Sequence, residues 1–215
     1  MKMNRTQMIL LLLAVTVVIF PLLLMDKSFV SADEALFLKI NDYWNPTFDS
    51  FFRILTELGS FTFWFVVIFV LWVCGRRTLA TYLLVAIAIH IALGGSMKYI
   101  IDRPRPFDVF SDTFAIYNPS DPSFPSGHTE GSFAAAAVLG MRNKKLLFPL
   151  ILLAIFVGLS RVYIGVHFPF DVVSGAVFGT LIGVFVAGLD LSRLQERMES
   201  GWKRILRPFR FERKG

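Results

Sequence analysis

Residues 146–164 read LLFPLILLAIFVGLSRVYI, and the only charged side chain in this run is Arg161, close to its end. A helix of about 20 apolar residues crosses the hydrocarbon core of a bilayer, so this segment is long enough to span a membrane. The whole 215-residue chain has the same character, because 55% of its residues are hydrophobic and only 18% are charged. We therefore expect a one-domain, all-α protein that crosses the membrane several times.

The expected architecture is a bundle of six transmembrane helices. The first apolar run has an alternative interpretation as a signal peptide, with Lys2 and Arg5 as its charged start and Val30-Ser31-Ala32 as its cleavage site. That run is longer than the roughly 7–15 apolar residues of a signal peptide, which favours a retained span. The membrane domain covers residues 1–192, and a basic tail covers residues 193–215. The predicted spans are residues 9–25, 61–74 with a start some residues earlier, 79–101, 127–141, 146–164 and 170–189.

The placement of basic residues predicts how the bundle is oriented. With six spans, the four basic segments fall on one side, which the positive-inside rule identifies as the cytoplasm. Both chain ends then lie in the cytoplasm, whereas the acid-rich segments 26–57 and 102–125 lie outside. The basic segments are Lys2 with Arg5, Arg76 with Arg77, Arg142 with Lys144 and Lys145, and the tail.

The net charge of +6 raises the question of an acidic partner. No nucleic-acid recognition fold remains once the spans are removed, so we expect the basic tail to lie near anionic lipid headgroups and not to bind nucleic acid. No protein partner is evident from the sequence.

An amphipathic helix is predicted between the first two spans, within residues 33–58. Phe48, Phe51, Phe52 and Leu55 recur at the spacing of one helical face, with polar residues between them. Such a helix lies in the membrane interface. Two roles are open, namely capping the bundle, which we favour slightly, and lining a route for lipid entry.

Basic residues gather at the predicted outer ends of the third to sixth spans. Lys98 lies near the end of the third span, and Arg105 follows within Arg103-Pro104-Arg105-Pro106. Each proline disfavours helix in the residue before it, so the span stops here. Basic side chains are under-represented on the outer side of a membrane, so a simple stop signal explains them poorly.

The sequence Pro125-Ser126-Gly127-His128 marks the start of the fourth span. Ser126 is a suitable N-cap residue, and the free N–H groups and dipole of a helix start bind anions. Gly127 allows an anion to approach the backbone closely, and His128 lies beside it in the first turn. On its own, this motif could equally be an ordinary capped helix start.

A histidine–aspartate pair is predicted at the start of the sixth span. Pro169 suits the first turn of that helix, which puts His167 just before it and Asp171 inside its first turn. The i, i+4 spacing lets the carboxylate reach one imidazole nitrogen and leaves the other free as a nucleophile. The alternative is a structural hydrogen bond at a helix start.

Together these residues suit a phosphoryl group. Arginine binds phosphate oxygens through two parallel hydrogen bonds, and phosphoryl transfer depends mainly on positioning and charge stabilisation. Lys98, Arg105 and Arg161 can supply the positive charge that a metal supplies elsewhere, so we expect neither metal nor cofactor. Three cations would also repel a divalent ion from the alternative, a metal hydrolase. Its ligands would be His128, Glu130, His167 and Asp171.

These motifs are similar to the complete three-part signature of the type 2 phosphatidic acid phosphatase superfamily. The resemblance covers residues 98–171, about a third of the chain, and no signature position departs from the pattern. Vanadium haloperoxidases share the constellation, but they are soluble. The matching positions are Lys98 and Arg105-Pro106, then Pro125-Ser126-Gly127-His128, then Ser160-Arg161, His167 and Asp171.

The resemblance implies a role for each site residue. His167 would be the nucleophile that forms a phosphohistidine, and Asp171 would orient it. His128 would be the general acid for the leaving oxygen and later the base that activates water. The family fold is a six-helix membrane bundle whose site faces outward in bacterial members, which agrees with the predicted topology. The phosphate would be bound by Lys98, Arg105, Ser126, Gly127 and Arg161.

The substrate of such a phosphatase is a lipid phosphate. An outward-facing site suits a polyprenyl diphosphate, the spent carrier of envelope glycan synthesis, and the resemblance also covers phosphatidylglycerophosphate and phosphatidic acid. A transporter or binder of lipid phosphates is a different class of function. The intact pair of His167 and Asp171 argues against it, because a binder needs no oriented nucleophile.

The third histidine of the chain, His90, lies in the middle of the third predicted span. It is about 12 Å along the helix from Lys98, at 1.5 Å per residue, so we expect an interhelical hydrogen bond and no direct catalytic role.

Overall fold

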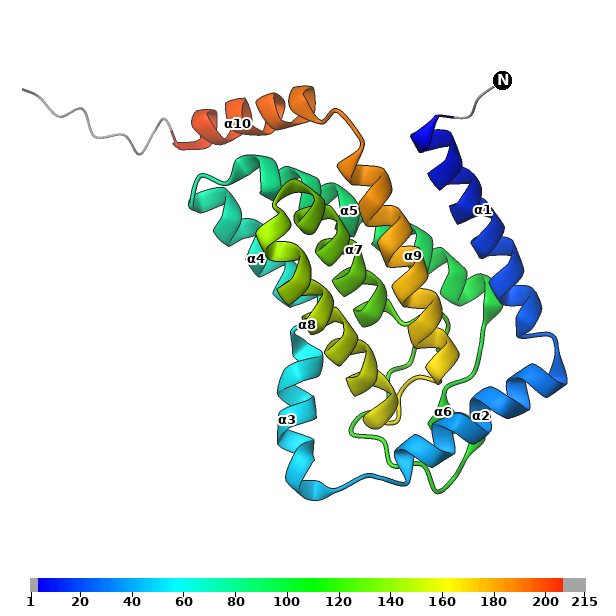
Figure 1. The fold of residues 1–215 in the computed structure, drawn as a ribbon. Coiled ribbons are helices and arrows are strands. Elements are labelled where there is room, and N and C mark those ends of the chain that lie inside the picture. Colours follow the sequence, from blue (N-terminus) through cyan, green and yellow to red (C-terminus); the bar gives the residue numbers. More distant parts are fainter. Residues whose placement is uncertain (1–3, 207–215) are drawn as a thin grey trace, which may run out of the picture.

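The computed structural model describes residues 4–206 as a bundle of α-helices, with no β-strand among them (Figure 1). Lys2 and the last nine residues of the predicted basic tail lie outside the described residues. The helices are α1 (Arg5–Leu23), α2 (Lys27–Asn41), α3 (Pro46–Glu57), α4 (Phe61–Val73), α5 (Arg77–Ile101), α6 (Pro106–Val109), α7 (Gly127–Arg142), α8 (Lys144–Tyr163), α9 (Pro169–Ala187) and α10 (Ser192–Leu206).

Each predicted span corresponds to a helix, namely α1, α4, α5, α7, α8 and α9. In the described part of the chain, four segments are long and apolar enough to cross a membrane. They are α1, α8, α9 and the segment Arg77–Val109, which contains α5. A fifth crossing results if α3 and α4, which bend by 51° at the break between them, are counted as one span. α7 has 16 residues and does not reach the length of a span. The protein is therefore a multi-pass helical membrane protein with four or five helices of spanning length.

The termini of these helices follow from local sequence. α5 ends at Ile101, where Asp102 takes a left-handed conformation with φ of 48° before the proline-containing segment that follows. Ser126 is the N-cap residue of α7, and Pro169 opens α9 because its missing N–H is not needed in a first turn. The predicted ends of the spans that carry the site motifs are confirmed to within two residues.

α7 lies at the centre of the bundle and packs against α5, α8 and α9 (Figure 1). Its interior residues from 134 to 140 are buried and mostly alanine. On the facing side of α9, a β-carbon at Gly179 would collide with the backbone carbonyl of Glu130. A β-carbon at Gly183, four residues later, would lie 2.5 Å from the carbonyl oxygen of Ala134, which is also a collision. Small residues at this spacing let two helix backbones approach closely, which sets the starts of α7 and α9 side by side.

The outer helices present large apolar side chains away from the bundle. α1, α4 and α8 expose many leucine, valine and phenylalanine residues, among them Leu11, Phe69 and Phe148. Exposed apolar surface of this extent is expected where a protein contacts lipid. α1 is also part of the packed structure, because Phe20 contacts the rings of Phe170 and Phe178 on α9.

The two ends of the bundle differ. α2, α3 and the long connection between α5 and α7 lie at the end drawn at the bottom of Figure 1, and α10 lies across the opposite end. α3 is the predicted amphipathic helix, and it exposes Phe48 and Phe51 while Phe52 stacks on Tyr163 of α8. α10 forms from the first part of the predicted tail.

Candidate active site

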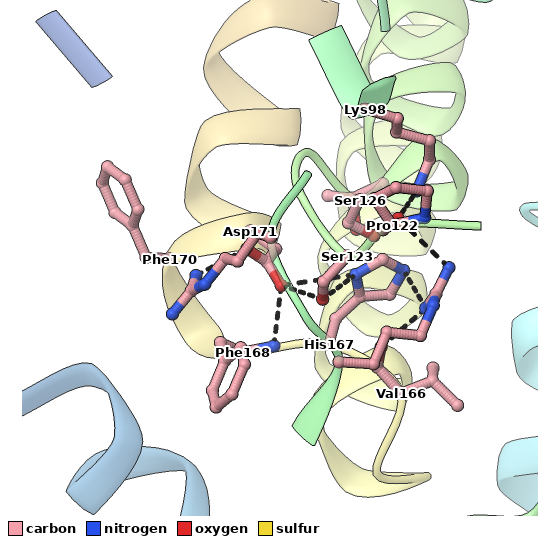
Figure 2. Close-up of polar contacts among 12 residues, drawn as sticks. Lys98, Pro122, Ser123, Ser126, Val166, His167, Phe168, Phe170 and Asp171 are labelled. Carbon is pink, nitrogen blue, oxygen red and sulfur yellow. Dashed lines mark hydrogen bonds and ion pairs between the residues drawn. The ribbon is translucent and has the colours of Figure 1, made fainter. Parts of the chain in front are cut away.

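The three motif segments meet at one end of the bundle. Lys98 is in the last turn of α5, Arg161 is in the last turn of α8, and Asp171 is in the first turn of α9. The backbone N–H of Ser126 donates to the carbonyl oxygen of Asp171 at 3.0 Å, which joins the start of α7 to the start of α9. Figure 2 shows Lys98, Ser126, His167 and Asp171 around this junction.

His167 and Asp171 lie close together but not in the expected direct hydrogen bond. Nδ1 of His167 is 3.5 Å from Oδ2 of Asp171, which is an ionic contact but long for a hydrogen bond. The hydroxyl of Ser123 lies beside both groups (Figure 2). It donates to Oδ2 of Asp171 at 2.6 Å and is 3.4 Å from Nδ1 of His167. The predicted pair is thus a trio, in which Ser123 takes the hydrogen-bonding position that the i, i+4 spacing assigned to the imidazole.

The strongest partner of Asp171 is Arg103. Nη1 of Arg103 donates to Oδ1 of Asp171 at 2.6 Å, and Nη2 donates to Asp33 of α2 at 2.7 Å. Asp33 in turn accepts the N–H of Phe170 at 2.9 Å. Burial opposes the charge on Arg103, but Asp171 and Asp33 outweigh it and raise the pKa of this guanidinium above its usual value. α2 is thereby tied to the histidine-bearing end of α9.

The second ring nitrogen of His167 faces the cationic side of the site. Nε2 lies 3.3 Å from Nη1 of Arg105. The imidazole is 2% exposed, and this burial lowers the pKa of His167 well below 6.5, against the effect of Asp171 and with the help of the nearby cations. His167 is therefore neutral at physiological pH, with a ring nitrogen directed to the place where an anion would be held.

Two of the predicted phosphate-binding cations share one carboxylate, that of Asp121. Its Oδ1 accepts from Nη2 of Arg105 at 2.8 Å, and its Oδ2 lies 3.0 Å from Nζ of Lys98. Lys98 also donates to the carbonyl of Pro122, and Arg105 donates to the carbonyl of Val166 at 2.7 Å. Burial raises the pKa of Asp121, but Lys98 and Arg105 outweigh burial and lower it, so the carboxylate is charged. Two carboxylate oxygens on two cations resemble the contacts that a phosphate would make.

The third predicted cation, Arg161, is arranged differently. Arg161 is 2% exposed, and its Nη1 donates to the hydroxyl groups of Thr56 at 2.7 Å and of Tyr117. Within residues 4–206, no carboxylate lies at ion-pair distance from Arg161. A buried positive charge held only by neutral oxygens can still stabilise an incoming anion.

The start of α7 has the form of an anion site. Ser126 occupies the predicted N-cap position, but its side chain does not cap the helix and instead contacts the hydroxyl of Thr129 at 2.9 Å. The first-turn N–H groups are thus not satisfied by a side chain, which suits an anion. His128 is half-buried in this turn, and its β-carbon lies near Gly59, in the connection between α3 and α4. No direct polar contact joins its ring to His167 in the part of the chain that the structure describes.

Several residues of this site were not predicted from the sequence. Arg103, Asp121 and Ser123 lie within or between the motifs, so their position near the motifs was a signal, although nothing distinguished them from their neighbours. Asp33, Thr56 and Tyr117 come from α2, α3 and a loop, and no local pattern indicated that they would lie near the motifs. Glu130, considered as a metal ligand, faces α5 instead and lies 3.3 Å from His90.

Fold and site together are those of an integral-membrane phosphatase, and known proteins agree. Residues 79–192, more than half of the chain, match the PAP2 superfamily. The chain is 32% identical over 177 residues to an undecaprenyl-diphosphatase of Sulfolobus acidocaldarius, with 81% of this chain and 86% of the relative covered. It is 31% identical over 154 residues to the undecaprenyl-diphosphatase BcrC of Bacillus subtilis, with 69% and 79% covered.

Solved structures show the same fold. LpxE of Aquifex aeolicus superposes with a TM-score of 0.67 at 34% identity, over 72% of this chain and 94% of that one. A PAP2-type phosphatidylglycerolphosphate phosphatase of Bacillus subtilis superposes with a TM-score of 0.72 at 24% identity, over 87% and 96%. The chain belongs to the PAP2 superfamily, which confirms the resemblance drawn from its motifs.

The carboxylate of Asp121 should compete with phosphate for Lys98 and Arg105. We expect Asp121→Asn to lower the inhibition constant of inorganic phosphate about 3- to 10-fold, because the change removes a half-exposed charge from two charge-assisted contacts. The measurement is inhibition of turnover by phosphate in the purified protein. Asp112→Asn, an exposed acid in the same loop, is the matched control and should change nothing. Weaker phosphate inhibition in Asp121→Asn would show that Asp121 organises the cations and does not compete.

Proposed function

We propose that the protein is an integral-membrane lipid phosphatase that hydrolyses a polyprenyl diphosphate of the undecaprenyl type. The observation that carries the proposal is the neutral, buried imidazole of His167, directed at cations that already hold a phosphate-like carboxylate. The substrate comes from the two relatives above, both named as undecaprenyl-diphosphatases. Phosphatidylglycerophosphate and phosphatidic acid are the alternative substrates, and a transporter or binder without chemistry is a remoter alternative.

In the proposed reaction, Nε2 of His167 attacks the terminal phosphorus. The bond from phosphorus to the leaving oxygen breaks, and His128 gives that oxygen a proton. Water then attacks the phosphohistidine, His128 takes a proton from the water, and phosphate leaves. Asp171 and Ser123 hold the ring of His167 in one orientation throughout.

The phosphate-binding groups of this proposal stabilise charge and take no part in covalent chemistry. Lys98, Arg105 and Arg161 surround the equatorial oxygens, and the start of α7 contributes the hydroxyl of Ser126 and the N–H of Gly127, because the N–H of Ser126 already donates to the carbonyl oxygen of Asp171. With this much positive charge supplied by side chains, the reaction needs no metal.

We also propose six spans, with both termini in the cytoplasm and the site on the outer side. The basic turns between α4 and α5 and between α7 and α8 lie at the end of the bundle opposite the site, as this topology requires. α7 is about 24 Å long at 1.5 Å per residue, less than the roughly 30 Å hydrocarbon core. The site would therefore lie below the outer lipid surface, where a lipid headgroup can enter sideways.

The substrate proposal is tested by phosphate release from a panel of purified lipid phosphates in the presence of excess chelator. We expect undecaprenyl diphosphate to give the highest kcat/KM, and we expect chelator to leave the rate unchanged because side-chain cations bind the phosphate. A higher kcat/KM for phosphatidylglycerophosphate or phosphatidic acid would show that this lipid, and not the polyprenyl diphosphate, is the preferred substrate. Activity lost in chelator and restored by magnesium or zinc would contradict the metal-free mechanism, and no release from any lipid would favour a binder.

The nucleophile is tested by trapping the intermediate. Wild-type protein given ³²P-labelled substrate and quenched in alkali, in which phosphohistidine survives, should carry label. His167→Ala should carry none and should lose on the order of 10⁴ in rate, as expected when a nucleophile is removed from such a unit. Asp171→Asn should fold but turn over much more slowly. Label retained in His167→Ala would place the nucleophile elsewhere.

The orientation is tested with single cysteines in a Cys74→Ser background, which removes the only native cysteine. On intact cells, an impermeant thiol reagent should label a cysteine in place of Asp121, in the loop beside the site. A cysteine in place of Asn143, between α7 and α8, should react only after the cells are opened. Labelling of the Asn143 position from outside would reverse the proposed topology.

A further inference from the structure

A second histidine–carboxylate pair is buried in the bundle, beside the start of α7. His90 lies in the middle of α5 and Glu130 in the first turn of α7, and their side chains are 3% and 0% exposed. Nδ1 of His90 is 3.3 Å from Oε1 of Glu130, an ionic contact without hydrogen-bond geometry, and the polar atoms of both side chains have no hydrogen-bond partner among residues 4–206. Ionisable groups in a membrane protein interior are costly and are usually functional.

The neighbouring residues leave room for this pair. Gly94 lies one turn after His90 on α5, and a β-carbon there would collide with the carboxylate of Glu130. A β-carbon at Gly131 would lie 3.3 Å from Nε2 of His90. The ring of Phe61 stacks on the imidazole with a centroid separation of 5.4 Å. The imidazole is therefore confined between α4 and the first turn of α7.

Glu130 lies where three site-bearing helices meet. Its side chain contacts α5, which carries Lys98 two turns beyond His90. Its backbone packs on α9, because a β-carbon at Gly175 would lie 3.2 Å from the nitrogen of Glu130. α9 carries Asp171 in its first turn, and α7 carries His128 two residues before Glu130. A change in the contact between His90 and Glu130 would rotate the first helical turn of α7 about its axis. The side chain of His128, in the same turn, would move with it.

We propose that His90 and Glu130 are positioning residues for His128. Their contact fixes the rotation of the first turn of α7 on α5, and thereby directs His128 at the leaving oxygen. The inference rests on the proposed function, since it assigns the pair to the proton-transfer step of that reaction. The alternative is a purely structural role, in which the pair holds α5 and α7 together and does not affect His128.

The test separates these two roles through the leaving group. Phenyl phosphate releases a phenol with a pKa near 10, which needs a general acid, whereas p-nitrophenyl phosphate releases a much more acidic phenol. We expect His90→Leu to lower kcat for phenyl phosphate on the order of 10- to 100-fold, and for p-nitrophenyl phosphate less than about 3-fold, because a small misplacement of a catalytic group has effects of this size. KM should stay within about 2-fold for both.

A conservative variant and a matched control complete the design. His90→Gln keeps a polar group that can donate to Glu130 and should keep kcat within about 3-fold of wild type, whereas Glu130→Leu removes the acceptor and should reproduce the leaving-group dependence of His90→Leu. Thr81→Val changes an equally buried polar side chain of α5 far from the site and should leave both rates unchanged.

Two results would overturn the inference. Equal losses on both aryl phosphates, in variants with an unchanged thermal midpoint, would assign the pair a merely structural role, and so would the absence of any loss. Wild-type activity on a lipid phosphate in the same preparation keeps the proposed function independent of that outcome. A wild-type protein inactive on every phosphate ester would overturn the proposed function and this inference together.

Discussion

The site depends on the complete burial of one carboxylate, that of Asp171. A buried charge is stable only when its oxygens are fully occupied by donors, and those donors come from segments far apart in the sequence. Arg103 follows α5, Ser123 precedes α7, and the N–H of Phe168 precedes α9. Satisfying this one group therefore brings three chain segments into register, and the second bond of Arg103, to Asp33, adds α2. The imidazole of His167 contacts Oδ2 of Asp171, so its orientation is restricted by the same set of contacts.

The positive charges of Lys98, Arg105 and Arg161 are neutralised less completely than the negative charge of Asp171. Lys98 and Arg105 share a carboxylate that is 39% exposed, and the partners of Arg161 in the described part of the chain are hydroxyl groups. The deeply buried carboxylates of Asp171 and Asp33 thus hold the groups around His167, whereas the cations proposed to bind phosphate have a half-exposed carboxylate or neutral hydroxyl groups as partners. A fixed arrangement of positive charge that is not fully compensated is the property that stabilises a phosphoryl group in transfer.

The helices and their ends could be predicted from the sequence because local rules decide them. Apolar runs gave the helices, and Pro104, Pro169 and the start at Gly127 gave the ends that carry the motifs. Composition does not decide the number of crossing helices, since α7 is short and lies inside the bundle, where an alanine-rich helix need not resemble a lipid-facing one. Spacing along one helix also predicted that His167 and Asp171 would be close.

The partners of those residues could not be predicted, because they depend on tertiary folding. Spacing within α9 says nothing of Ser123, which comes from another segment and takes the hydrogen bond to Asp171. Arg103 and Arg105 are neighbours in a repeated Arg-Pro pattern, yet one serves the carboxylate and the other faces the imidazole. Alternation along an extended segment would place residues two apart on the same face, so the different roles of the two arginines come from the tertiary contacts of each side chain.

The carboxylate between Lys98 and Arg105 has a consequence for selectivity inside a bilayer. Most lipids around the protein are phosphodiesters, which carry one negative charge on the phosphate and are present in vast excess over any substrate. A phosphomonoester or a diphosphate terminus carries close to two charges at neutral pH. A headgroup with one negative charge gains little binding free energy when it displaces the equally charged carboxylate of Asp121 from Lys98 and Arg105. A headgroup with two negative charges is attracted more strongly than that carboxylate and can displace it. Under the proposed function, Asp121 is an internal competitor that sets a threshold of charge for the headgroups that occupy the site.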